Sequence, residues 1–73
     1  MACVKPNGEL TELGRRVLDG LAVHATPEAA AAAVGLPVYR ARMAARALEA
    51  AGLARGEAGR YALTPEGERR LAM

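Results

Sequence analysis

Apolar side chains recur at helical spacing in two separate segments of the chain. In the first segment, leucine or valine occupies positions 10, 13, 17, 18 and 21. In the second, alanine or leucine occupies positions 41, 44, 45 and 48. Steps of three and four residues place such side chains along one side of an α-helix. After Gly52 the period changes to an alternation typical of short strands, so the pattern predicts helices followed by a small β-structure.

Three threonines mark the starts of predicted helices. Thr11, Thr26 and Thr64 are each followed within two positions by a glutamate. A threonine hydroxyl can accept a hydrogen bond from the first turn, and a negative charge is favourable at that end of a helix. Pro27 and Pro65 directly follow two of these threonines, at a position where the missing N–H costs nothing. We therefore predict helices after all three threonines, the first ending near residue 22 or 23.

The second predicted helix is short and leads through a tight turn into the third. Gly35 is a C-terminal stop for the second helix, and Pro37 is predicted at the first position of the third, which spans residues 37–51. Two helices joined by a short turn containing glycine are typical of a helix-turn-helix. His24 is expected in the turn between the first two helices, in a structural or exposed place.

A hairpin is predicted after the third helix. Residues 53–55 and 60–63 are candidate strands, joined by a four-residue loop that contains two glycines. The alternation directs Tyr61 inward and Arg60 outward. The segment after Thr64 resembles the start of the first helix, LTPEGERRL against LTELGRRVL. We interpret this similarity as shared helix-start residues and not as an internal repeat.

The composition limits the size of the core. The 73 residues form one domain without Phe or Trp, and much of the 52% hydrophobic content is alanine. A chain of this size buries only about 60% of its unfolded surface and has a small stability margin. We therefore expect a homodimer in which the first helix or the N-terminal segment shares apolar surface with a second copy.

Positive charge is concentrated in one part of the chain. The formal net charge is +2, but residues 37–60 alone carry +3 and the remainder carries −1. This distribution favours an anionic partner on the third helix and the hairpin.

Several function classes are not expected. Cys3 is the single cysteine, and His24 has only scattered carboxylates as potential co-ligands, so neither a disulfide nor a metal site is predicted. The sequence contains no nucleophile–base pair and no phosphate-binding glycine loop. We therefore expect neither an enzyme nor a cofactor, and no small-molecule substrate is evident. The start of the chain is no signal peptide, and its longest apolar run is too short to span a bilayer, so a cytoplasmic protein without membrane contact is expected.

The order of the predicted elements and the sequence itself resemble those of a known domain family. The segment TPEAAAAAVGLPVYRARMAARALEAAGL, a short hairpin and then RYALTPEG follow one another. This arrangement resembles the winged helix-turn-helix domain of bacterial and archaeal transcriptional regulators, with MarR-type and PadR-type regulators as the most similar. The resemblance implies a mainly α fold with a three-helix core, a two-stranded wing and a short C-terminal helix. The resemblance covers about residues 10–71, and we predict a winged helix-turn-helix domain at residues 10–73, preceded by an N-terminal segment at residues 1–9.

The resemblance implies double-stranded DNA as the partner and a small transcriptional regulator as the function. In such domains the third helix enters the major groove and the wing lies along the backbone. Carried over to this sequence, the residues that face the bases are Tyr39, Arg40, Arg42, Met43 and Arg46. Arg55 and Arg60 of the wing and the helix start at Thr26 are the expected phosphate contacts. Glu57 at the tip of the wing departs from the basic residue that would suit DNA.

A second function class remains open from the sequence. Winged helices also serve as protein-interaction modules within larger complexes, because a fold does not determine its site. The outer side of the third helix distinguishes the two readings. Arginines at positions 40, 42 and 46 favour nucleic acid, whereas Val38 and Met43 are compatible with a protein partner.

Overall fold

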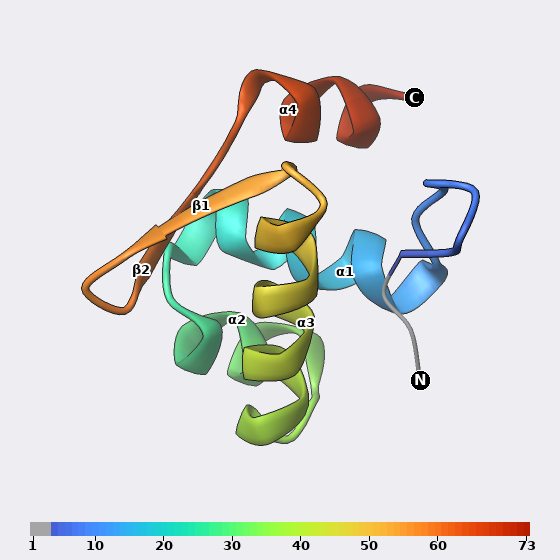
Figure 1. Cartoon of the computed structure of the whole chain (residues 1–73). Coiled ribbons are helices and arrows are strands. Elements are labelled where there is room, and N and C mark those ends of the chain that lie inside the picture. Colours follow the sequence, from blue (N-terminus) through green and yellow to red (C-terminus); the bar gives the residue numbers. More distant parts are fainter. Residues whose placement is uncertain (1–3) are drawn as a thin grey trace.

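The computed structural model describes residues 4–73, so the predictions made for Cys3 lie outside the described residues. Figure 1 shows the path of the chain: three helices, a two-stranded antiparallel sheet and a final short helix. The elements in chain order are α1 (Glu12–His24), α2 (Pro27–Val34), α3 (Val38–Ala50), β1 (Ala54–Glu57), β2 (Arg60–Leu63) and α4 (Pro65–Ala72). The predicted fold class is confirmed, and the order of elements has winged-helix topology.

The three predicted helix starts are confirmed. The hydroxyls of Thr11, Thr26 and Thr64 each accept a hydrogen bond from the N–H three residues further on. Pro37 differs from the prediction, because its extended backbone (φ −62°, ψ 146°) makes it the N-cap residue of α3 and not the first helical residue. Like many helix ends, these boundaries differ from the sequence estimate by one residue or two.

Helix α1 extends slightly beyond its predicted end. Ala25 closes it in the left-handed conformation, with φ 68° and ψ −18°, and donates its N–H to the carbonyl of Leu21. His24 is therefore the last residue of the helix and not part of the turn, and it is exposed. An alanine at a left-handed position costs roughly 1 kcal/mol, because its Cβ approaches the backbone.

Ala25→Gly is therefore expected to raise the free energy of unfolding by about 0.5–1 kcal/mol, because glycine adopts this conformation without the clash. Ala22→Gly is the matched control, since Ala22 is an exposed residue inside the same helix and should lose about 1 kcal/mol. Urea unfolding of both variants measures the two effects. Equal losses in the two variants would contradict the role given to Ala25.

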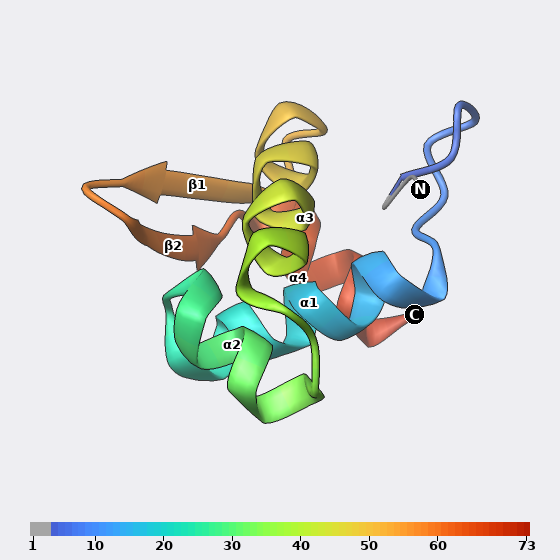
Figure 2. The same ribbon diagram turned by 90° about the horizontal axis from the view of Figure 1, so that it is seen from below.

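The core lies where α1, α2 and α3 meet. Its largest fully buried side chains are Val17, Leu18, Leu21, Leu48 and Leu53. Alanines complete the core and permit short distances between helices: a Cβ placed on Gly20 of α1 would lie 3.0 Å from the Cβ of Ala30 in α2. Gly20 therefore marks a close approach of α1 to α2. In Figure 2, α3 lies in front of α1, and α4 lies behind α1.

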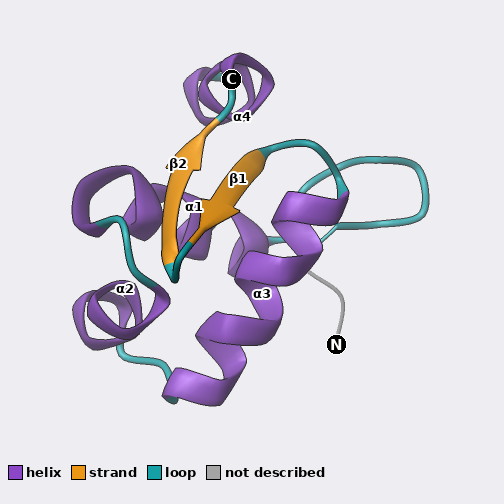
Figure 3. Ribbon diagram, turned by 60° about the vertical axis from the view of Figure 1, so that its left-hand side comes forward, coloured by secondary structure: helices purple, strands orange, loops and turns teal. Residues whose placement is uncertain are grey.

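The wing is a tighter hairpin than the predicted one. Residue pairs run from Ala54 opposite Leu63 to Glu57 opposite Arg60, so the turn has two residues and not four. Both turn residues, Ala58 and Gly59, have positive φ (53° and 81°), which is typical of a type I′ turn. Gly56 belongs to β1, where it pairs with Tyr61, and the ring of Tyr61 leaves no room for a side chain there: a Cβ on Gly56 would be 2.7 Å from that ring. The paired strands are visible in Figure 3.

Both the wing and α4 are hydrogen-bonded to the helical core. The N–H of Tyr61 donates to the carbonyl of Ala25 over 2.6 Å, and the N–H of Gly56 donates to the Glu49 carboxylate over 3.3 Å. At the base of the wing, the Thr64 hydroxyl donates to the carbonyl of Gly52 over 2.6 Å. The wing is therefore held by the turn that precedes α2 and by the end of α3.

Candidate nucleic-acid interface

Helix α3 presents a polar and aromatic face to solvent. Its opposite side is buried through Ala41, Ala44, Ala45 and Leu48. Tyr39 and Met43 are 62% and 61% exposed, and Arg42 and Arg46 are exposed beside them. Arg40 is half-buried at the edge of this face. All five residues that the resemblance assigned to base contact thus lie on α3 outside its buried stripe, and their roles stay predictions.

Arg42 is not free on this face. Its guanidinium forms an ion pair with the carboxylate of Glu28 in α2, with Nη2 2.7 Å and Nε 2.8 Å from the same oxygen, Oε2. Both side chains remain largely in water, at 59% and 49% exposure. An exposed pair of this kind contributes little to stability, because water screens the two charges. The pair instead matters for the position of Arg42, because it holds the guanidinium of an arginine that lies on the candidate DNA-facing surface.

The start of α2, where a phosphate contact is predicted near Thr26, is capped within the chain, and that contact stays a prediction. Pro27 has no N–H, the N–H of Ala29 donates to the Thr26 hydroxyl over 3.2 Å, and the N–H of Ala30 donates to the Thr26 carbonyl over 2.9 Å. The pKa of the Glu28 carboxyl is lowered, mainly by the hydrogen bond from Arg42 and then by its own backbone N–H. The Glu28 carboxylate therefore occupies the place at this helix start that an external anion would take.

A small hollow joins α2, α3 and the tip of the wing. Its lining comes from Pro27, Glu28, Arg42, Arg46, Gly59 and Tyr61. We call it the α2–α3–wing hollow. In this hollow the Glu28–Arg42 ion pair and Arg46 of α3 lie beside the wing. No local sequence pattern indicates that these residues are close together.

The outer side of the wing carries the two predicted phosphate contacts. Arg55 and Arg60 are exposed, and Glu57 lies between them, directly across from Arg60 in the strand pairing. Within residues 4–73, the guanidinium groups of Arg46, Arg55 and Arg60 form no ion pair with a carboxylate. Three arginines on α3 and the wing are thus available to an anionic partner.

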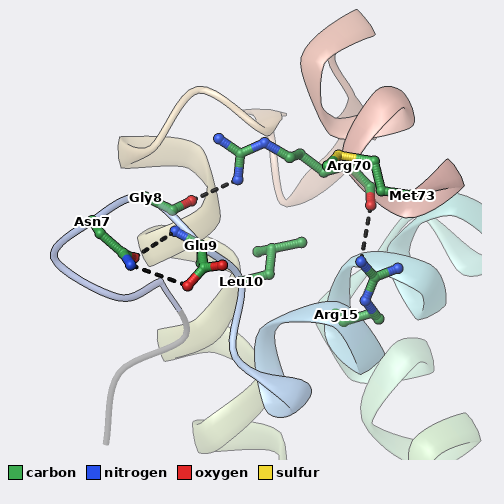
Figure 4. A pocket seen from close by; sticks show the side chains of 7 residues that line it. All are labelled: Asn7, Gly8, Glu9, Leu10, Arg15, Arg70 and Met73. Carbon is green, nitrogen blue, oxygen red and sulfur yellow. Dashed lines mark hydrogen bonds between the residues drawn. The ribbon is translucent and has the colours of Figure 1, made fainter.

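Other arginines are bonded to the protein itself. Arg15 donates to the carbonyls of Arg70 and Leu71 at the end of α4, and Arg16 donates to the carbonyl of Val34 at the end of α2. Figure 4 shows Arg70 donating to the carbonyl of Gly8, which ties the N-terminal turn to α4. These arginines satisfy backbone carbonyls, most of them at helix ends, a role that the sequence analysis did not assign.

The chain matches no protein-family model, and no curated protein or solved structure is significantly similar to it. Its assignment to winged-helix topology therefore rests on the arrangement of its elements. In the part of the chain that the structure describes, no helix has the length and apolar character needed to cross a membrane.

Proposed function

We propose that the protein binds double-stranded DNA sequence-specifically by inserting α3 into the major groove, as a small transcriptional regulator. The observation that carries this proposal is the exposed face of α3, where Arg46 has no carboxylate partner within residues 4–73 and Tyr39 and Met43 stand beside it. The wing adds Arg55 and Arg60 at the flank of that helix.

The chemistry of this face suits base edges. The major groove is about 12 Å wide and admits an α-helix. An arginine can donate two hydrogen bonds to guanine, and an apolar side chain such as Met43 can contact a thymine methyl group. The wing arginines suit phosphates, which position a protein on the duplex without reading its sequence.

A binding assay on duplex DNA at two salt concentrations tests the proposal. We expect binding of a mixed-sequence duplex that weakens steeply with salt, because each neutralised phosphate releases counterions. A tighter, less salt-sensitive complex should be recovered by selection from a random-sequence pool. Size-exclusion chromatography with mass measurement on the same samples tests the predicted homodimer. Salt-independent or absent duplex binding by the folded protein would overturn the proposal.

A protein-interaction module is the second candidate function, and one observation favours it. Val38, Tyr39 and Met43 give α3 an exposed apolar stretch, with Val38 at 40% exposure. Large exposed apolar patches are typical of surfaces that bind other proteins. The two functions differ in the effect of arginine removal: alanine in place of Arg46 should reduce the discrimination between DNA sequences, but should leave an interaction through apolar contacts nearly unchanged.

A further inference from the structure

Glu28 faces the candidate DNA-binding surface, although it belongs to α2. Its carboxylate contacts Arg42 of α3 at 2.7 Å and lines the α2–α3–wing hollow together with Arg46. A negative charge in this place can act against a phosphate in two ways, by direct repulsion or by pairing with the arginine that the phosphate would contact. The stability of the fold does not depend on this charge to any large extent, because an exposed ion pair contributes little.

The Glu28 carboxylate has the same partners that a DNA phosphate would have. A phosphate at the start of a helix is stabilised by backbone N–H groups and by a nearby guanidinium. Here the carboxylate takes the hydrogen bonds of Arg42, which lower its pKa more than its own backbone N–H does, so it stays ionised at neutral pH. The carboxylate is thus a substitute for the phosphate within the chain.

We propose that Glu28 competes with DNA phosphates for Arg42 and restricts this arginine to base contacts, and this inference rests on the proposed function. On a random duplex, a phosphate offers Arg42 only one exposed anion in place of another, so Arg42 stays paired with Glu28 and adds no phosphate contact. On a cognate site, Arg42 exchanges the carboxylate for a two-hydrogen-bond contact with a guanine, which discriminates between bases. Glu28 therefore keeps Arg42 from contacting phosphates on non-specific DNA and leaves it to contact DNA only where a guanine is within reach.

The test compares Glu28→Gln with the wild type by fluorescence anisotropy on a mixed-sequence duplex and on a duplex selected for tight binding. We expect Glu28→Gln to bind the mixed-sequence duplex roughly fivefold more tightly. The salt slope on that duplex should steepen by about 0.9, because Arg42 then neutralises one more phosphate. The affinity for the selected duplex should also rise, because Arg42 no longer has to leave a partner, but the salt slope on that duplex should stay unchanged, because Arg42 contacts a base there and not a phosphate.

Two matched variants separate this role from a general charge effect. Asp19→Asn makes the same change in net charge at an exposed position of α1 and should leave both affinities nearly unchanged. In an Arg42→Ala background, the further change Glu28→Gln should no longer steepen the salt slope. Circular dichroism of each variant verifies that the helices are retained. If Glu28→Gln fails to fold, titration of the wild type with the mixed-sequence duplex, followed through the Glu28 carboxyl carbon by NMR, replaces it, and an unchanged signal in the complex would overturn the inference.

The outcomes distinguish the inference from the proposed function. If the wild type binds DNA and Glu28→Gln behaves like Asp19→Asn, the competition is absent while DNA binding stands. If Glu28→Gln acts equally with and without Arg42, Glu28 repels phosphates directly and the inference is wrong. If neither the wild type nor Glu28→Gln binds any duplex, both the proposed function and the inference are overturned.

Discussion

Gly67→Ala is expected to lower the free energy of unfolding by about 3 kcal/mol, at the upper end of what overpacking costs. Gly67 is a buried residue in the first turn of α4, and a Cβ added to it would lie 2.0 Å from the carbonyl oxygen of Leu53. That oxygen is backbone and already accepts a hydrogen bond from the N–H of Thr64. Neither group can move alone, so α4 must shift away from the base of the wing.

Thermal unfolding measured by circular dichroism tests this expectation, with a fall of roughly 15 °C in melting temperature for a domain of this size. Gly20→Ala is the matched control, because it adds the same methyl group to another buried helical glycine. Its new Cβ would meet the side chain of Ala30 at 3.0 Å, and the improved helix propensity offsets part of the strain. A Gly67→Ala protein as stable as Gly20→Ala would show that α4 does not pack on Leu53 as described.

Arg46→Ala is expected to cost roughly 1–3 kcal/mol of binding free energy on a selected duplex and much less on a mixed-sequence duplex. Arg46 is exposed on α3 and lies beside the ion pair of Arg42, so its guanidinium can reach a base edge when the helix is inserted. Arg60→Ala should behave differently. Arg60 projects from the outer side of the wing, and its loss should weaken both duplexes equally and lower the salt slope by about 0.9.

Arg69→Ala serves as the control for both changes, because Arg69 is an exposed arginine of α4 that pairs with Glu66. Binding isotherms on the two duplexes at several salt concentrations give all of these quantities. Equal affinities for Arg46→Ala, Arg60→Ala and Arg69→Ala, together with unchanged melting temperatures, would make the arginines of α3 and the wing a solvated surface. The protein-interaction module would then be the better explanation of the exposed face.

Sequence signals that act within a few residues were sufficient to predict the helix boundaries but not the boundaries of the wing strands. The threonine caps and the Gly35 stop act within one helical turn, so the sequence alone places the helix boundaries to within one or two residues. The turn of the wing was predicted two residues too long because Gly56 and Glu57 were assigned to the loop. Their pairing with Tyr61 and Arg60 places them in β1, and the ring of Tyr61 lies against Gly56, a contact that no neighbouring residue indicates.

The candidate site shows the same division. The exposed positions of α3 follow from helical spacing, because residues opposite the alanine stripe must face solvent. The partner of Arg42 could not be predicted in this way. Glu28 lies 14 positions earlier in the sequence. Its place in the first turn of a helix, where a negative charge is favourable, already explained why a glutamate occurs there. Only the packing of α2 against α3 brings the two charges together.

The bond between Tyr61 and Ala25 has a consequence for the thermodynamics of any complex. Because the wing is joined to the turn before α2 and also to Glu49 of α3, its position relative to α3 is set before a partner arrives. Association then requires little additional ordering of the backbone, and the conformational entropy lost on binding is small. A loose wing would have to be ordered at the moment of contact and would adapt to grooves of different width. This wing instead offers a fixed distance between α3 and its own arginines, which restricts the shapes of duplex that it can fit.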